Sequence, residues 1–114
     1  MTIDELIQQI RSDPHCVDFQ QVIETINANY DFQPTQFHNG DITNAPGTNE
    51  GSCRIFAFAQ LHRLNEAETL ACFGQFYRDV IATPHGTDHA NIRSFIRDGW
   101  AGIRFDGIAL SLKR

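Results

Sequence analysis

Residues 52–64 predict a helix that is apolar on most of its sides, and such a helix has to lie at the centre of a fold. Its apolar residues are Ile55, Phe56, Phe58, Ala59 and Leu61. The segment before it, Asn39 to Cys53, carries three Gly and three Asn residues. Connections usually take about 2–6 residues, and longer ones are usually functional or disordered. Since this segment leads directly into a buried helix, we expect an ordered loop that presents backbone N–H groups beside a helix start, where a ligand can bind.

Four further helices are predicted from capping residues and apolar spacing. Their expected N-terminal residues are Thr2, Asp18, Asn65 and either Thr87 or Asp88. The central helix is expected to have Ser52 as its N-cap and to end near Leu64. Residues 65–82 are expected to form one continuous helix. One of its faces would hold Leu70, Phe73, Gly74, Tyr77, Val80 and Ile81.

Two stretches predict extended chain. Residues 30–37 fit an edge strand or an extended segment, because Pro34 has no N–H to donate. Residues 100–105 and 108–112 flank Asp106-Gly107, which predicts a hairpin with Ile108, Leu110 and Leu112 directed inward. The expected fold class is α+β: one mainly helical domain over residues 1–114, with about five helices and a small antiparallel sheet that includes this C-terminal hairpin.

Composition and charge exclude several classes of function. The net charge is -5 at pH 7 and the pI is about 5.4. We therefore expect no binding to nucleic acid or to anionic membranes, because both need basic surface. No apolar run approaches the ~18–20 residues of a membrane span, and the N-terminus lacks a signal peptide. Three cysteines without framework spacing indicate free thiols in a reducing compartment. We expect a cytoplasmic monomer without a cofactor.

Cys53 is the first candidate for chemistry. It falls in the first turn of the predicted central helix, where the helix dipole favours a thiolate. His89 or His85 can act as its base if the fold brings them close, which makes a cysteine-dependent hydrolase or transferase one hypothesis. The alternative is a small buried thiol, since free cysteine is among the most buried residue types.

The second candidate is the polar cluster at residues 85–93. His89 can exchange protons near neutral pH, and Arg93 follows one turn later. Each residue also has an ordinary role as a cap, a packed side chain or an ion-pair partner. Our leading hypothesis is a binding module whose polar pocket takes an anionic or amide-bearing small molecule or a peptide end. The expected lining residues are Asn49, Glu50, Ser52, Cys53, Asp88, His89, Asn91 and Arg93. A protein-interaction domain is a third hypothesis.

Metal and phosphate motifs receive less support. His85 and His89 are four residues apart, but a predicted helix boundary separates them, so they should not share a face. Further ligands would have to come from His38, Asp41 or His62. We expect no metal site. No Gly-rich motif with a following Lys occurs, which leaves simple anion binding at a helix start. One regular spacing, which we treat as chance, is that of Asn39, Asn44 and Asn49.

Several short segments, spread over nearly the whole chain, occur in the order that is typical of one protein family. They are Asn39-Gly40, Gly47-Thr48-Asn49-Glu50-Gly51-Ser52-Cys53, Thr69-Leu70, Phe73-Gly74, Tyr77-Arg78-Asp79-Val80, Pro84, Asp88-His89, Asn91-Ile92-Arg93 and Gly99-Trp100. In this order the chain resembles the HopJ family of type III effector proteins. The resemblance implies a bacterial source, a small single-domain protein, delivery into a host cell by type III secretion and a host protein partner. It assigns no catalytic residues.

The N-terminus favours a different cellular role. Type III secretion signals are usually flexible N-terminal segments, whereas residues 2–11 predict a capped amphipathic helix that a small core would retain. We also expect no additional secretion segment before this helix. We therefore hypothesise a housekeeping cytoplasmic protein that is related to effectors.

Overall fold

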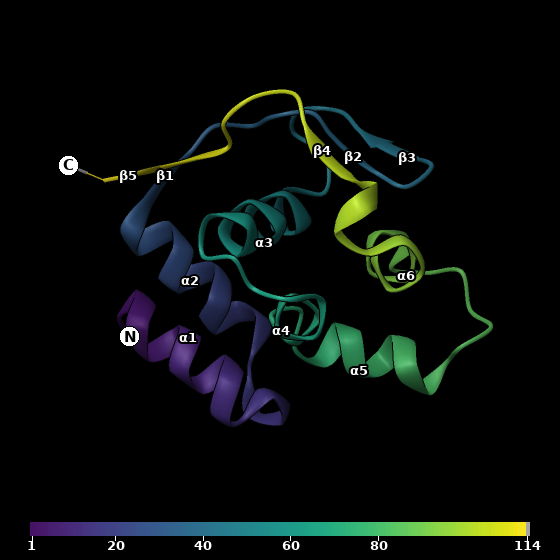
Figure 1. Ribbon diagram of the computed structural model, residues 1–114, viewed down its shortest axis with the longest axis horizontal. Helices are drawn as coiled ribbons and strands as arrows, with labels where there is room; N and C mark the ends of the chain where they lie inside the picture. Colours follow the sequence, from purple (N-terminus) through teal and green to yellow (C-terminus); the bar gives the residue numbers. More distant parts are fainter. Residues whose placement is uncertain (114) are drawn as a thin grey trace.

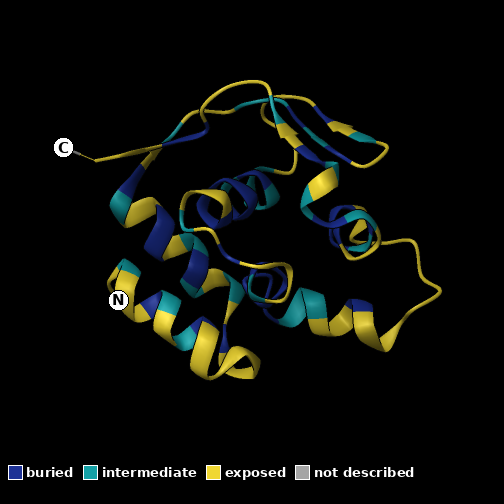
Figure 2. Cartoon of the chain, viewed as in Figure 1, coloured by how far each residue is buried: buried dark blue, intermediate teal, exposed yellow. Residues whose placement is uncertain are grey.

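The apolar central helix predicted from the sequence is α3, Glu50–Leu61. The computed structural model describes residues 1–113 and places α3 beneath the strands, with most of the remaining helices on its other side (Figure 1). Most of α3 is buried, in contrast to the half-exposed outer helices (Figure 2). Phe56 is its aromatic centre, with ring centroids 5.1 to 6.4 Å from those of four other aromatic residues. These are Phe37, Phe73, Phe95 and Trp100.

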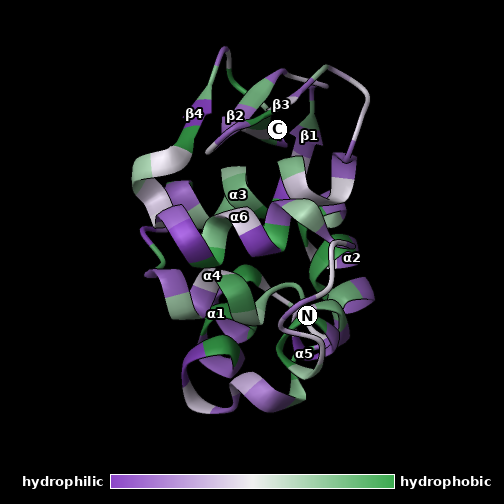
Figure 3. Ribbon diagram, turned by 90° about the vertical axis from the view of Figure 1, so that its right-hand side faces the viewer, coloured by the Kyte–Doolittle hydropathy of each residue, from purple (hydrophilic) through white to green (hydrophobic). Residues whose placement is uncertain are grey.

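Five other α-helices surround α3 within residues 1–113. They are α1 (Ile3–Ser12), α2 (Phe19–Asn29), α4 (Glu66–Ala71), α5 (Gln75–Ala82) and α6 (Ala90–Asp98). Viewed from the side, the strands lie above, α3 and α6 beneath them, and α1, α4 and α5 further below (Figure 3). The α+β, mainly helical fold class is confirmed. Within residues 1–113, none of the helices combines the length and the hydropathy that a membrane span requires.

Capping chemistry correctly places the starts of three helices. Thr2 and Glu5 form a capping box at α1, and Asn65 and Glu68 form another at α4. The side chain of Asp18 accepts the backbone N–H of Gln21 at the start of α2. These residues satisfy N–H groups that would otherwise lack a partner, so the local sequence decides where each helix begins.

The single helix expected over residues 65–82 is wrong, because the chain breaks it into α4 and α5 at Gly74. Gly74 has φ 56°, and an added Cβ would lie 2.6 Å from the backbone nitrogen of Phe19. Only glycine combines this conformation with so close an approach of another backbone segment. The break also turns Ile81 outward, where it is 57% exposed instead of lying on the buried face.

Two distant segments, residues 30–39 and 103–112, form one antiparallel ribbon over α3. β1 (Tyr30–Phe32) pairs with β5 (Leu110–Leu112), and β2 (Phe37–Asn39) pairs with β4 (Ile103–Phe105) in the same register. Between the two pairs, Gln33 N–H still donates to the carbonyl of Ala109, at 2.8 Å. Pro34 has no N–H to give, so the ladder is interrupted there.

The expected C-terminal hairpin is not formed, because β4 and β5 pair with different strands. Asp106 bonds to the neighbouring segment instead: its N–H donates to the carbonyl of Gln36 at 3.0 Å, and its carboxylate accepts from Gln36 Nε2 at 2.8 Å. The predicted inward alternation is correct for Leu110, which is buried, and wrong for the residues around it. Ile108 and Leu112 are 77% and 67% exposed, whereas Ala109 is buried.

A real hairpin lies in the segment for which the sequence predicts a loop. β3 (Ile42–Asn44) pairs with β2 across the two-residue turn Gly40-Asp41. Gly40 has φ 59°, and an added Cβ would lie 2.6 Å from Ser94 Oγ of α6. The first half of the expected 39–53 loop is therefore a hairpin that packs against α6, and only residues 45–49 connect it to α3.

Candidate functional site

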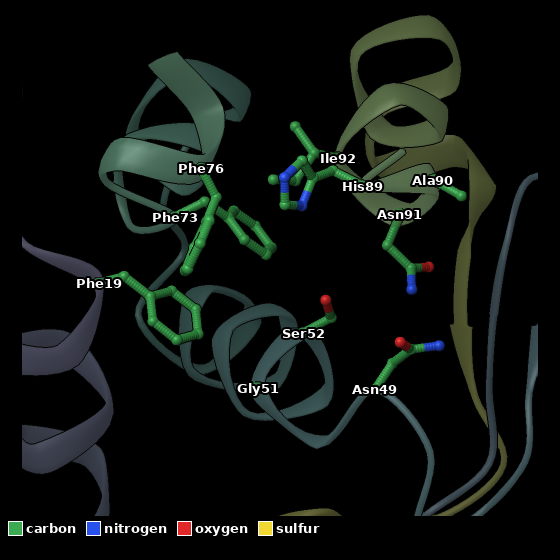
Figure 4. A pocket seen from close by; sticks show the side chains of 10 residues that line it. All are labelled: Phe19, Asn49, Gly51, Ser52, Phe73, Phe76, His89, Ala90, Asn91 and Ile92. Atoms are coloured by element: carbon green, nitrogen blue, oxygen red, sulfur yellow. The ribbon is translucent and has the colours of Figure 1, made fainter. Parts of the chain in front are cut away.

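The starts of α3 and α6 lie on the wall of one cavity with a volume of about 260 Å³. Four of the eight predicted lining residues are on this wall, namely Asn49, Ser52, His89 and Asn91. The other four, Glu50, Cys53, Asp88 and Arg93, are not on it. Lining residues that sequence reasoning did not assign to a site are Phe19, Gly51, Phe73, Phe76, Ala90 and Ile92. Figure 4 shows aromatic side chains on one side of the cavity and polar ones on the other.

The aromatic side of the cavity comes from α2, α5 and the connection between α4 and α5. Phe19 and Phe76 pack edge to face, with ring centroids 4.9 Å apart. Phe73 is buried and also lines the cavity. Gly51 allows the Phe19 ring to approach α3, because an added Cβ would lie 2.9 Å from Phe19 Cζ. This side offers flat apolar surface to the body of a ligand.

The polar side is built by two helix starts with unusual backbone conformations. Asn49 at α3 has φ 48° and His89 at α6 has φ 52°, and neither side chain caps its helix. The N-caps expected at Ser52 and at Thr87 or Asp88 are therefore wrong. The first N–H groups of both helices lack side-chain caps, and such groups attract acceptor atoms and negative charge.

Four asparagines form a hydrogen-bonded network behind this polar side, and we call Asn39, Asn44, Asn49 and Asn91 the asparagine cluster. Asn44 Oδ1 accepts from Asn49 Nδ2 at 2.7 Å and from Asn91 Nδ2 at 3.0 Å. Asn91 Oδ1 accepts from Asn39 Nδ2 at 3.0 Å and from Asn44 Nδ2 at 3.1 Å. Asn39, Asn44 and Asn91 are buried. Amides do not titrate, so this network is neutral at any ordinary pH.

The five-residue spacing of Asn39, Asn44 and Asn49 has a structural cause, and treating it as chance was wrong. In the β2–β3 hairpin, Asn44 lies opposite Phe37. Asn39 lies two residues after Phe37, so both asparagines face inward on the same side of the hairpin. A turn closed by the Thr48 N–H to the Ala45 carbonyl, at 3.0 Å, then brings Asn49 back to them. The regular spacing in the sequence could therefore have predicted this part of the site.

Arg93 fixes the loop that precedes α6, which we call the 83–88 loop. Its Nη1 and Nε donate to the carbonyls of Thr83 and Asp88, at 2.8 and 2.6 Å, and its Nη2 donates to the Asp88 carboxylate at 2.7 Å. The hydrogen bond from Arg93 is the main reason that the pKa of Asp88 lies below its ordinary value. Arg93 and Asp88 thus hold the backbone that leads to His89.

His89 projects from this loop to the aromatic side of the cavity. Its ring centroid lies 5.3 Å from that of Phe76, and Figure 4 shows both rings at the cavity. Its Nε2 lies 3.8 Å from a carboxylate oxygen of Asp88. The ring therefore combines an apolar contact with nitrogen atoms that can bond to a ligand.

Cys53 is separated from the cavity. Its side chain is buried, and its thiol donates to the carbonyl of Thr35 at 3.6 Å. Burial raises the pKa of Cys53, so the thiolate expected at a helix start is disfavoured. The structure thus places the proposed nucleophile under the ribbon and the proposed base, His89, at the cavity.

The histidines considered as metal ligands serve different parts of the fold. His38 lies 3.2 Å from the Asp106 carboxylate, and His62 lies 2.6 Å from the Tyr30 hydroxyl. Over residues 1–113, no three His, Cys, Asp or Glu side chains gather as a metal site would require. Neither histidine lies on the cavity wall.

Comparison with known proteins agrees with the resemblance noted in the sequence. The family model described as HopJ type III effector protein matches residues 3–110. A solved structure described as unknown function protein VPA0580 is 44% identical and has a TM-score of 0.97. The match covers 99% of this chain and 95% of that chain. The comparison with curated proteins finds no match. With nearly its whole length matched, the chain belongs to the HopJ family of type III effector proteins.

Proposed function

We propose that this HopJ-family protein is a small binding module whose ligand occupies the cavity between α3 and α6. The observation that carries the proposal is the division of this cavity into an aromatic side and a polar side (Figure 4). Ligand sites typically combine apolar surface with a few polar groups that set orientation. A small molecule or peptide end with an apolar body and an anionic or amide head matches this division.

The size of the cavity limits the ligand. Sites for drug-sized ligands usually measure about 300–1,000 Å³, and this cavity of about 260 Å³ lies just below that range. The apolar body would pack on Phe19 and Phe76, while Ser52 and His89 would contact the polar head. Affinity for so small a ligand would come from a few well-placed groups rather than from a large buried area.

No observation favours a cysteine-dependent reaction in this cavity. The thiol of Cys53 is directed to the Thr35 carbonyl, its pKa is raised by burial, and it does not line the cavity that holds His89. Nucleophilic catalysis requires a base within hydrogen-bond reach of an activated nucleophile. Binding therefore explains the arrangement with fewer assumptions than a hydrolase or transferase does.

The binding module can be tested by NMR with two probes, phenylacetamide and phenylacetate, at millimolar concentration. Binding in the cavity should shift the backbone amides of residues 49–52 and 89–92. Ser52→Phe should abolish the shifts because the larger side chain fills the cavity. Ser111→Phe, the same change at an exposed strand position, should leave them unchanged. Unperturbed spectra with both probes, or equal shifts in Ser52→Phe, would exclude this cavity as the site.

The family is described as a type III effector protein, and this name suggests delivery into a host cell, where a host protein would be the partner. We propose instead a role within the producing cell, because α1 is part of the core: Leu6 and Ile10 are buried. A flexible secretion signal would not be expected to have such contacts. The intact protein should therefore stay inside a cell that has an active type III system, and export that is lost when residues 1–15 are removed would refute the cellular role.

A further inference from the structure

We propose that the polar head of the ligand is a neutral carboxamide, whose N–H donates to Asn49 Oδ1. This inference rests on the binding function proposed above and narrows its ligand class from anions and amides to amides. It follows from the asparagine cluster, which determines how the side chain of Asn49 is oriented at the cavity.

The orientation of the cluster begins at a backbone carbonyl. Asn39 Nδ2 donates to the carbonyl of Asn91 at 2.8 Å, and a carbonyl can only accept. The same nitrogen donates to Asn91 Oδ1 at 3.0 Å, which fixes the amide of Asn91 as well. Asn91 Nδ2 must then be the donor to Asn44 Oδ1, at 3.0 Å.

A second backbone carbonyl gives Asn44 the same orientation independently. Asn44 Nδ2 lies 3.5 Å from the carbonyl of Phe37 and 3.1 Å from Asn91 Oδ1, so its oxygen is on the other side. That oxygen faces Asn49, and only the Asn49 amide nitrogen can bond to it, at 2.7 Å. The alternative orientation of Asn49 would place two acceptor oxygens against each other.

Because Asn49 Nδ2 is bonded within the cluster, Asn49 Oδ1 is the amide atom that faces the cavity. In Figure 4 this oxygen lies on the side of Ser52, and the amide nitrogen lies on the opposite side. It does not cap α3, because the left-handed backbone of Asn49 prevents the usual cap geometry. The cavity wall thus carries an acceptor whose direction is set by three buried side chains behind it.

The cluster also has an energetic cost that close packing does not explain. Asn39 Oδ1 is buried without a hydrogen-bond partner within residues 1–113. Leaving such an acceptor unpaired costs free energy of folding. A buried apolar cluster of similar volume would avoid this cost, so the amides are better explained by the orientation they impose than by stability.

The neighbouring groups select a carboxamide among head groups. A carboxylate has no N–H for Asn49 Oδ1 and would place an oxygen against it. An ammonium group could donate, but the positive ends of α3 and α6 disfavour a cation there. A carboxamide is neutral and is both a hydrogen-bond donor and an acceptor. Its N–H donates to Asn49 Oδ1, and its carbonyl oxygen accepts from the Ser52 hydroxyl or from an uncapped N–H at a helix start.

The test compares three probes that share one aromatic body: phenylacetamide, phenylacetate and phenethylamine. NMR titration of the intact protein should give a dissociation constant for phenylacetamide about tenfold lower than for either other probe, the order expected for one good polar contact. Asn49→Gly removes the acceptor while retaining the left-handed backbone, since glycine adopts φ > 0 readily. It should weaken phenylacetamide binding about tenfold and reduce the preference over phenylacetate to near unity.

Arg63→Gly is the matched control, because Arg63 also has a left-handed backbone, with φ 53°, and does not line the cavity. It should bind all three probes as the parent protein does. Equal affinities for phenylacetamide and phenylacetate, with no effect of Asn49→Gly, would overturn the carboxamide inference and leave the binding function standing. Absence of binding by all three probes would overturn both.

Discussion

The cavity has two supports that are built in opposite ways. Three of the four residues of the asparagine cluster are buried, the network is uncharged, and each of its amides is oriented by its neighbours. The 83–88 loop is exposed and is held by the charged side chain of Arg93, through Thr83 and Asp88. One support depends on hydrogen bonds that water cannot replace, and the other on contacts that water and salt weaken.

Because of this difference, we expect the side of the cavity at Asn49 to be rigid and the side at His89 to be able to shift. A buried amide network has one low-energy arrangement, so Asn49 should present the same atom in the free and bound protein. An exposed loop held by one arginine can shift when a ligand contacts His89, because surface ion pairs contribute little to stability. Ligand specificity should therefore arise at Asn49, and adaptation to ligand shape at His89.

The largest loss of stability is expected from a substitution within the asparagine cluster. Asn44→Ala leaves Asn49 Nδ2 and Asn91 Nδ2 without an acceptor and opens a small cavity. The unpaired amide of buried Asn91 and the cavity together lower the free energy of unfolding by about 2–4 kcal/mol in total, whereas Asn49 is exposed and its amide can bond to water. Urea denaturation followed by circular dichroism measures this loss.

The control for this change is an asparagine on the surface. Asn27 is exposed and accepts one hydrogen bond, from Arg54 Nε at 2.9 Å. Asn27→Ala should lower the free energy of unfolding by no more than about 0.5 kcal/mol, as for most surface substitutions. Similar losses in the two variants would show that burial does not give the cluster its importance.

Two glycine-containing turns show what the sequence could and could not predict. The same short-range rule applies to Gly40-Asp41 and to Asp106-Gly107, since each dipeptide lies between short stretches that can form strands. The first is a hairpin turn that we missed, and the second was predicted as a turn but joins strands of different sheets. The rule fails at Asp106-Gly107 because residues 30–39 compete for the same backbone groups over a long distance in sequence.

Local signals were reliable where the physical cause was itself local. The capping boxes at Thr2 and Asn65 and the apolar character of α3 were predicted correctly, because a few adjacent residues satisfy the first N–H groups or cover the helix. The break at Gly74 was missed because its cause is the backbone of Phe19, which belongs to another helix. No periodicity within residues 65–82 reports that contact.

The polar residues of the site were partly predictable and its aromatic side was not. Asn49, Ser52, His89 and Asn91 were chosen because they lie near expected helix starts, and the cavity includes them. Phe19, Phe73 and Phe76 have spacings that fit an ordinary core. Their position at a cavity depends on the tertiary arrangement of α2, α5 and α3, which the linear sequence does not encode visibly.

The smallest effect is expected in the 83–88 loop, whose contact with Arg93 depends on the protonation of Asp88. The pKa of Asp88 in the fold is below its ordinary value, mainly through the hydrogen bond from Arg93 and less through His89. A lowered pKa means that the contact is complete above the unfolded-state pKa and is lost as pH falls through the folded-state value. Acidification below about pH 4 should therefore loosen the 83–88 loop without unfolding the protein.

The measurement is ¹⁵N relaxation of residues 84–88 between pH 6 and the acid range, where motion should increase in a single step. Asp88→Asn keeps the side-chain size and removes the titration, so its loop should show the same mobility throughout. Asp98→Asn is the control, since the pKa of Asp98 is also lowered, by Arg97, at the opposite end of α6. That variant should retain the step in the 83–88 loop. A step that persists in Asp88→Asn would mean that another group controls this loop, and the contrast between a neutral and a charged support would then fail.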